Sequence, residues 1–299
     1  MMHPLIEEGS GKLPVRRLCE LASLPRASYY RAAHPLTSGP GQANAKILEE
    51  IYSICQEMPA YGSPRVTAEL RRRGYGVNHK RVSRLMRKAN LHCRRKRRFV
   101  RTTDSKHGFR VYPNLAREIV PVRPDELWRA DITYVHLACE VVYLAVILDA
   151  FSRRVIGWAL ARHINAELTV TALKMALERR KGQPGLIHHS DRGSQYACDE
   201  YIKILHEHRF TISMSRKGNP YDNAMAESFM RTIKVEEVYI NEYTTVADAY
   251  ANIKNFIEIV YNHKRLHSSL GYKTPEEIEV EFHNQQSTLA TQKTVSTQG

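Results

Sequence analysis

The stretch LWRADITYVHL, at residues 127–137, begins the part of the chain whose pattern decides the fold. EVVYLAVILDA at 140–150 and RRVIGWALA at 153–161 follow it, and all three are rich in the β-branched and aromatic residues that favour strands. Only a few residues separate them, whereas a parallel return needs a crossover of about a dozen residues or more. The pattern therefore predicts three strands in an antiparallel meander.

Helices and strands alternate after this meander. Apolar stripes at helical spacing predict helices at 165–181 and 199–209, and short apolar runs predict strands at 185–189 and 211–215. Three adjacent strands followed by helix, strand, helix and strand predict an α/β fold. We expect a mixed five-stranded sheet with helices on both of its faces.

Beyond the sheet, helices that begin at capping residues are predicted at 245–261 and 275–281. The tail at 283–299 is rich in Gln, Ser and Thr and is predicted to be disordered. The α/β domain with its C-terminal helices is therefore expected to span residues 126–282.

The stretch NPYDNAMAESFMRTIKVE, at 219–236, predicts a helix that is entered through a turn, with Asp222 or Asn223 as its cap. At 3.6 residues per turn, one face collects four polar side chains, which are Asn223, Glu227, Arg231 and Lys234. One carboxylate backed by two cations on a docked helix can serve a phosphate site. Taken alone, however, the stretch favours an ordinary solvated face with an i,i+4 ion pair.

The N-terminal part of the chain is predicted to be helical. Two short helices around a tight turn at 14–32 predict a helix-turn-helix-like segment within residues 1–35. After a linker, a second such arrangement predicts a helical DNA-binding domain with a basic tail at 45–100. Its three helices are expected at 45–57, 63–73 and 78–89. Residues 101–125, which include three prolines, are predicted to be a connector.

Positive charge is concentrated in this N-terminal part. The chain carries a formal net charge of +14, and residues 1–125 hold 25 Lys and Arg against 10 Asp and Glu. Five consecutive cations stand at 94–98, and the predicted helix at 78–89 adds Arg84 and other basic residues. A basic part beside a nearly neutral remainder predicts that the first part binds a polyanion, with DNA or RNA favoured over an acidic membrane.

Five acidic side chains in the α/β domain are candidates for phosphoryl transfer, because hard divalent cations prefer oxygen ligands and two-metal sites need convergent carboxylates. They are Asp131, Asp149, Asp191, Asp222 and Glu227. Asp131 lies inside a predicted strand and Asp191 follows another, whereas Asp149 and Asp222 have structural explanations as a turn former and a helix cap. Composition and spacing do not choose among the five.

Three motifs in fixed order carry a resemblance to a known family. WRADITYV at 128–135, HHSDRGSQY at 188–196 and the stretch at 219–236 together resemble the integrase-type catalytic core of bacterial insertion-sequence transposases. The most similar member is the second-frame protein, OrfB, of the two-frame IS-three family. The similarity continues in YNHKRLHSSLGYKTP at 261–275 and, less specifically, in the N-terminal helical regions. Thirty-five residues between Asp191 and Glu227 make the match specific.

The resemblance implies which residues carry the chemistry. It assigns the catalytic, metal-binding carboxylates to Asp131, Asp191 and Glu227, and a DNA-contacting cation to Lys234. It also implies an RNase H-like fold and a DDE transposase, a polynucleotidyl transferase that uses two Mg²⁺ or Mn²⁺ ions to cleave transposon ends and transfer the strands into DNA. The further candidates for DNA contact are Asn223, Arg231, Arg84, Arg94, Arg95, Lys96, Arg97, Arg98 and Arg265.

Two other functions stay open. One is a DNA-binding regulator whose integrase-like core does not catalyse, and the intact acidic trio argues against it. The other is a retroviral-type integrase or nuclease. The N-terminal part lacks the paired His and Cys spacing of a zinc module, and this absence argues against the second.

The expected partners are double-stranded DNA at the transposon ends and the target, further copies of the chain on that DNA, and the family's first-frame protein, OrfA. The resemblance implies OrfA, fused or separate, and residues 1–125 contain no sustained heptad repeat of their own for dimerisation. The chain shows neither a signal pattern nor a run of about 18 apolar residues. The resemblance implies the bacterial cytosol, on the nucleoid, as the expected location.

Overall fold

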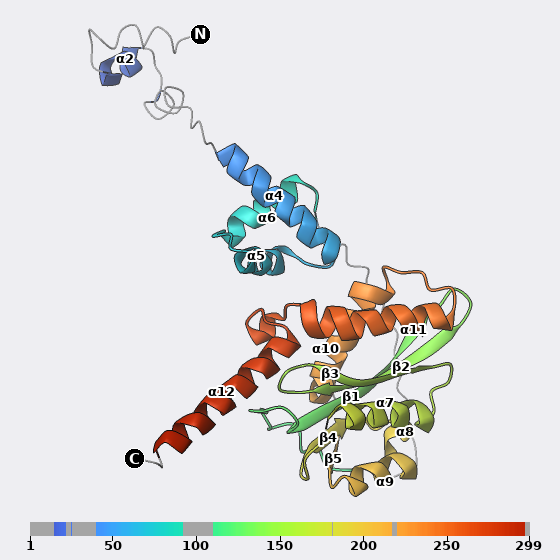
Figure 1. The fold of residues 1–299 in the computed structure, drawn as a ribbon. Helices are drawn as coiled ribbons and strands as arrows, with labels where there is room; N and C mark the ends of the chain where they lie inside the picture. The colour runs from blue at the N-terminus through green and yellow to red at the C-terminus, as the bar shows by residue number, and fades with distance from the viewer. Residues whose placement is uncertain are drawn as a thin grey trace. The chain divides into compact units, whose positions relative to one another are not determined.

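A computed structural model describes residues 15–21, 25, 40–91, 110–180, 182–216 and 220–296 (Figure 1). The chain forms two compact units, Met1–His92 and Cys93–Gly299. None of the helices in the described ranges combines the length and the apolar composition that crossing a membrane requires.

The first unit is helical. The described elements are α2 (Val15–Leu21), α4 (Pro40–Glu57), α5 (Ser63–Arg72) and α6 (His79–Lys88). The last three share a small core formed by Ile47, Ile51, Ile54, Val66, Leu70, Val82 and Met86. The predictions of helices at 45–57, 63–73 and 78–89 are confirmed, although α4 already begins at Pro40. The second helix predicted within 14–32 and the basic run at 94–98 lie outside the described residues.

A five-stranded sheet forms the centre of the second unit. Its strands are β1 (Leu127–His136), β2 (Val141–Asp149), β3 (Val155–Ala161), β4 (Ile187–Ser190) and β5 (Thr211–Met214). The strand order is β3-β2-β1-β4-β5. The first three strands pair antiparallel, whereas β4 lies parallel to both β1 and β5. The predicted meander and the predicted mixed sheet are both confirmed.

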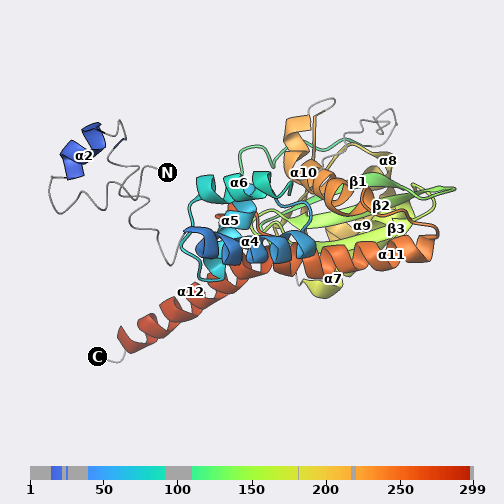
Figure 2. The same ribbon diagram turned by 90° about the horizontal axis from the view of Figure 1, so that it is seen from above.

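Helices cover both faces of this sheet (Figure 1). One face packs against α7 (Ala166–Arg179), α8 (Ser194–Ala197) and α9 (Asp199–Glu207). The other packs against α10 (Ala224–Ile233), the π-helical turns η2 (Lys234–Val238) and η3 (Phe256–Lys264), and α11 (Val246–Asn255). Seen from above, α10 lies close to β1 and α11 runs along the β3 side, where Tyr250 contacts Trp158 (Figure 2).

Alternation along β1 decides which side chains reach which layer. Trp128 and Ala130 pack toward α7, whereas Val135 packs toward α10. Because successive side chains in a strand point to opposite faces, Asp131 lies on the face that α10 covers. This face is the one on which the C-terminal motifs meet the sheet.

The last helix, α12 (Pro275–Ser296), corrects the prediction of a disordered tail at 283–299. Its start is capped as expected, because the Thr274 hydroxyl accepts from the Glu277 N–H at 3.2 Å. Glu279 then anchors the helix by accepting from Ser152 Oγ at 2.7 Å. No glycine or proline interrupts residues 276–296, and extending an anchored helix costs far less than starting one. The helix therefore continues past the core (Figure 1).

Two short 3₁₀ turns complete the unit, η1 (Pro220–Asn223) before α10 and η4 (Ser268–Leu270) before α12. Residues 110–125, which fall in the predicted connector, form neither helix nor strand. They are nevertheless tied to the sheet, because the Leu115 N–H donates to Ser213 Oγ at 2.9 Å and Ala116 is buried.

Candidate active site

The strand register brings Asp131 and Asp191 together. Arg129 on β1 is paired with His189 on the parallel strand β4. Two residues further along each strand stand Asp131 and Asp191, and neighbouring strands lie about 4.8 Å apart. A hydrogen bond from the Gly193 N–H to Asp191 Oδ1, at 2.9 Å, holds the Asp191 carboxylate in the turn after β4.

The electrostatics of Asp131 show that Glu227 and Lys234 belong to the same cluster. Burial raises the pKa of Asp131 well above its usual value, and the charges of Asp191 and Glu227 raise this pKa further. The Ile132 N–H and the Lys234 ammonium act in the opposite direction. Glu227 lies at the surface, and partial desolvation raises its pKa too. Two carboxylates and one cation, from a turn and a helix, thus act on the Asp131 carboxylate of β1.

Two hydrogen bonds fix the start of α10 against β1. The Arg129 guanidinium donates to the Asp222 carbonyl at 2.6 Å, and the Asn223 side-chain amide donates to the Ala130 carbonyl at 3.0 Å. Both β1 residues directly precede Asp131. Because Glu227 follows Asn223 by about one helical turn, these bonds bring its carboxylate to the Asp131 end of the strand.

Asn223 is the N-cap residue of this helix, as predicted, but the predicted side-chain hydrogen bond of the cap is wrong. Neither Asp222 nor Asn223 accepts a hydrogen bond from a helical N–H through its side chain. The Asp222 carboxylate instead accepts from the backbone N–H of Arg216 at 2.9 Å and from its guanidinium at 3.1 Å. The turn is therefore held by an ion pair to the segment that precedes it.

This ion pair makes the turn sensitive to acid. The hydrogen bond from the Arg216 guanidinium lowers the pKa of Asp222 to about 2 from its ordinary 3.8. A depressed carboxyl pKa contributes stability above the unfolded-state value, and this contribution is lost as the pH falls toward the folded-state value. We expect Asp222→Asn to destabilise the protein at pH 7, with the difference from wild type shrinking between about pH 4 and 2. Urea unfolding across this range measures it, and a pH-independent difference would contradict it.

Asn223 is not exposed where the DNA contact was predicted. Its side chain is only 4% exposed, and its amide nitrogen donates to the Ala130 carbonyl. Its Oδ1 is buried and has no hydrogen-bond partner among the described residues. The observed geometry gives Asn223 a positioning role between α10 and β1.

Arg265 is also not placed for the predicted DNA contact. Its guanidinium donates two bonds to the Glu236 carboxylate, each at 2.7 Å, and its side chain is only 4% exposed. Its ring neighbour Tyr261 and the adjacent His267 complete the enclosure. Arg265 is therefore a structural residue that joins η2 to the segment after η3.

Arg231 and Lys234 differ in their surroundings. Arg231 is exposed, and among the ion pairs formed by described residues none joins it to Glu227, so the solvated i,i+4 pair considered from the sequence is absent there. Lys234 is half-buried, and its Nζ lies 3.8 Å from the centroid of the Tyr134 ring. Both cations stay candidates for phosphate contact.

Two histidines of the second motif and the candidate acid Asp149 have structural roles. His188 and His189 are buried. His188 forms a hydrogen bond with Tyr201, and His189 forms hydrogen bonds with Ser213 and Ser215. Burial lowers their pKa values to about 3 and about 4, so they are neutral. Asp149 accepts from the N–H groups of Ser152 and Asp125, each at 2.8 Å, as predicted for a turn former.

Sequence reasoning missed two aromatic neighbours of the acids. One is Tyr134, under the Lys234 ammonium. The other is Tyr196, whose buried hydroxyl has no hydrogen-bond partner among the described residues. Burial, with smaller effects from Tyr201, Asp191 and Asp131, raises the pKa of Tyr196. Both tyrosines lie inside the motifs at 128–135 and 188–196, and this position in the sequence could have indicated that they lie near the site.

The three carboxylates are oxygen donors of the kind that a hard divalent cation prefers. The charges of Asp191 and Glu227 raise the pKa of Asp131, and a cation among the three would offset this repulsion. Among the described residues, however, no group of three or more acidic, histidine or cysteine side chains is arranged so that it could hold a metal ion. Metal binding by the trio therefore stays a prediction.

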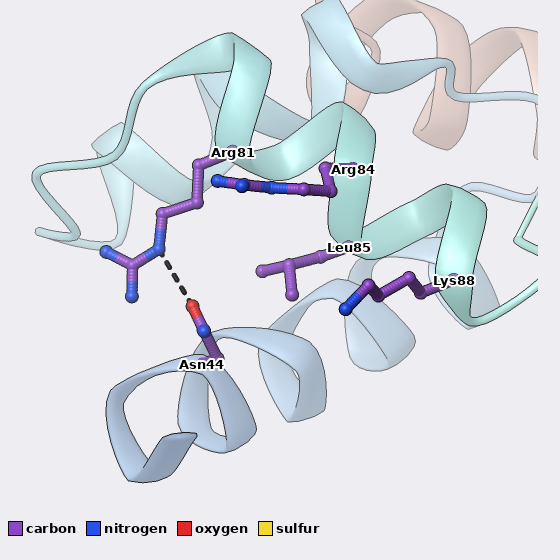
Figure 3. A pocket seen from close by; sticks show the side chains of 5 residues that line it. All are labelled: Asn44, Arg81, Arg84, Leu85 and Lys88. Carbon is purple, nitrogen blue, oxygen red and sulfur yellow. Dashed lines mark hydrogen bonds between the residues drawn. The ribbon is translucent and has the colours of Figure 1, made fainter. Parts of the chain in front are cut away.

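A basic cleft lies between α4 and α6 in the first unit (Figure 3). It has a volume of about 440 Å³ and is lined by Asn44, Arg81, Arg84, Leu85 and Lys88. The Arg81 guanidinium donates through Nε to Asn44 Oδ1 at 2.9 Å. The predicted DNA contact Arg84 therefore has basic neighbours on the same helix, and no acidic side chain lines this cleft.

Family models match most of the chain. Residues 42–99 match an HTH-like domain, and residues 121–220 and 208–275 match two models of an integrase core domain. Among solved structures, a simian T-cell lymphotropic virus intasome chain has 15% identity and a TM-score of 0.45 over 77% of this chain and 74% of its own. The HTLV-2 integrase catalytic core domain in complex with magnesium has 17% identity and a TM-score of 0.41, over 53% of this chain and 98% of its own.

Curated relatives are much more similar. The chain is 37% identical over 268 residues to the insertion element IS600 uncharacterized 31 kDa protein of Shigella sonnei, covering 89% of this chain and 98% of that protein. It is 38% identical over 241 residues to the transposase for insertion sequence element IS904 of Lactococcus lactis, covering 80% and 95%. It is 34% identical over 283 residues to transposase InsF for insertion sequence IS3A of Escherichia coli, covering 93% and 98%.

The family models and the sheet order agree on an RNase H-like integrase core preceded by a helical HTH-like region. The resemblance seen in the three motifs is thereby confirmed at the level of the family. Given this identity over nearly the whole length of its relatives, the chain belongs to the IS3 family of insertion-sequence transposases, as an InsF- or OrfB-like member.

Proposed function

We propose that this transposase cleaves transposon ends and transfers the strands into DNA by metal-dependent transesterification, with Asp131, Asp191 and Glu227 as its catalytic carboxylates. The observation that carries the proposal is that two acids act on a third, since the charges of Asp191 and Glu227 both raise the pKa of Asp131. A protein gains no stability from collecting repelling carboxylates in a half-buried site, so their convergence calls for a cationic ligand.

Asp131 on the central strand, Asp191 in the turn after β4 and Glu227 on α10 are the residues that would hold two Mg²⁺ or Mn²⁺ ions. When bound, such ions activate an attacking water or 3′-hydroxyl and stabilise the leaving oxygen of an in-line displacement. The rigid sheet and the bonds from Arg129 and the Asn223 amide hold the carboxylates for this purpose.

The cations near the trio would hold the DNA backbone. Lys234 is within electrostatic reach of Asp131, and exposed Arg231 lies one turn before it on the same helix. Their contacts with phosphates would place the scissile bond over the carboxylates. We also propose double-stranded DNA as the substrate, further copies of the chain on that DNA, and OrfA as a partner. The site requires no covalent protein–DNA intermediate.

The test is strand cleavage and joining on linear DNA that carries the element's own ends, with Mg²⁺ or Mn²⁺ supplied or with EDTA in excess. We expect nicked ends and joined strands only with the metal, and only on DNA with the correct ends. Products of equal yield in EDTA would overturn the proposed metal dependence. An absence of products with every divalent metal, in the presence of OrfA, would overturn the proposed activity.

The helical unit should bind DNA through its basic cleft, with Asn44 orienting Arg81 for a backbone phosphate. The bond from Arg81 Nε to Asn44 leaves both terminal nitrogens of the guanidinium for a phosphate. We expect Arg81→Ala to weaken binding by a similar factor on different sequences and to reduce the salt slope by about 1, since one phosphate contact is lost. Binding isotherms at several salt concentrations measure both quantities.

The control for this prediction is Lys46→Ala, an exposed cation of α4 that does not line the cleft. It should change the salt slope less than Arg81→Ala does. An equal reduction by both variants would show that the cleft is not a specific phosphate site.

A further inference from the structure

The Lys234 ammonium sits over an aromatic ring close to the acidic trio. Its Nζ lies 3.8 Å from the centroid of Tyr134, well inside the range of about 6 Å for a cation–π contact. Tyr134 is 9% exposed and Lys234 is half-buried, so solvent screens this contact only in part.

The backbone holds both partners in place. Lys234 stands where α10 passes into the π-helical turn η2, and buried Ile233 and Val238 pack the two sides of that junction into the core. Such turns recur at functional sites, because they re-aim a side chain within a helix. Tyr134 is paired with Tyr143 on β2, and its ring packs edge-on against His136 with centroids 5.0 Å apart.

The Tyr134 ring contacts the Lys234 ammonium directly, whereas no carboxylate of the described residues does. Among the ion pairs formed by described residues, none includes Lys234. The charge of Lys234 nevertheless lowers the pKa of Asp131. Burial lowers the pKa of Lys234, and the charge of Asp131 acts in the opposite direction. A carboxylate in direct contact would compete with a phosphate for the ammonium's N–H groups. The face of a ring stabilises the cation and takes no N–H donor in a directional bond.

We propose that Tyr134 is a positioning residue whose ring holds the Lys234 ammonium beside the acidic trio, ready to donate to a DNA phosphate. The inference rests on the proposed function, since it names how that site places the DNA backbone. The Tyr134 hydroxyl has no part in it, so a phenylalanine ring should serve as well.

The first test compares duplex DNA binding in EDTA for four variants at several salt concentrations. Lys234→Gln should weaken binding several-fold and reduce the salt slope by about 1. Tyr134→Leu should do nearly the same, whereas Tyr134→Phe should stay within about twofold of wild type. The double variant Tyr134→Leu/Lys234→Gln should bind no worse than Lys234→Gln alone, because both changes remove one interaction.

Other results would overturn the proposal. If the two single effects multiply in the double variant, the ring acts independently of the lysine. If Tyr134→Leu binds like wild type, the ring positions nothing. The binding measurements contain no metal and no chemical step. A negative result for Tyr134 therefore does not contradict the proposed catalysis. Conversely, if the protein does not join DNA strands, the binding measurements still test the role of Tyr134.

A second test keeps the proposal falsifiable if Tyr134→Leu does not fold. Phenylalanine analogues with increasing fluorination, incorporated at position 134, preserve the ring's shape but reduce the negative charge of its face. Binding should weaken stepwise from phenylalanine to the trifluorinated ring in the wild-type background and stay constant in Lys234→Gln. A flat series in both backgrounds would overturn the proposal.

Discussion

Asp191→Ala is expected to abolish strand cleavage and joining while leaving DNA binding intact. The carboxylate stands in the turn after β4, where the Gly193 N–H orients it beside Asp131. Its loss would remove a metal ligand, and a catalytic metal contributes several kcal/mol to transition-state stabilisation. A loss of about 4 kcal/mol corresponds to a rate about a thousandfold lower. Glu227→Gln should have an effect of similar size.

The control is Glu200→Gln, an exposed acid in the first turn of α9, which should retain nearly full activity. Gel-based joining assays and binding isotherms, measured on the same preparations, separate chemistry from DNA affinity. Variants that fold and bind DNA normally but still join strands at the wild-type rate would refute the assignment of these carboxylates.

Asp131→Asn should lose activity to the same extent and yet make the metal-free protein more stable. Burial and two neighbouring acids raise the pKa of Asp131, so its ionised form destabilises the folded state increasingly as the pH rises above the unfolded-state pKa. The neutral asparagine removes this repulsion. Thermal unfolding in EDTA at neutral pH measures the effect, which is expected as a higher midpoint.

Arg265→Ala is expected to destabilise the protein by about 3 to 5 kcal/mol, because it removes both hydrogen bonds of a buried ion pair to the Glu236 carboxylate. The side chains are 4% and 11% exposed, so water cannot replace the lost bonds. Urea unfolding measures this change. Arg231→Ala, at an exposed position on α10, should alter stability by less than about 0.5 kcal/mol.

The double variant Glu236→Leu/Arg265→Met gives this prediction a second readout. Replacing both members of a buried ion pair with apolar residues is often neutral or stabilising. We therefore expect the double variant to recover most of the lost stability. If Arg265→Ala weakens DNA binding while leaving the free energy of unfolding unchanged, the structural role given to Arg265 is wrong and the DNA contact predicted from the sequence is right.

Much of the fold was predictable because its signals are local. The three stretches at 127–161 are rich in the β-branched and aromatic residues that favour strands, and their short connections dictate an antiparallel order. The Thr274 cap also depends on residues three positions apart. The candidate trio could be named because its motifs are contiguous, although its roles in metal binding and catalysis stay predictions.

The polar residues around the trio were less predictable, because their partners lie far away in the sequence. Asn223 bonds to a carbonyl 93 positions earlier, and Arg265 pairs with a carboxylate 29 positions earlier. Asn223 and Arg265 carry the same polar groups as residues that bind DNA. Only the folded structure shows that these groups form hydrogen bonds to other parts of the protein.

By itself, then, the sequence determined the fold class, the order of the elements and the three motifs of the family, since all of these are written in neighbouring residues. The tertiary structure alone decided that Asp222 pairs with Arg216, that the Asn223 amide holds α10 to β1, and that Lys234 sits over Tyr134. The physical reason is that burial and pairing decide whether a polar group is free to bind a ligand, and both depend on residues that only folding brings together.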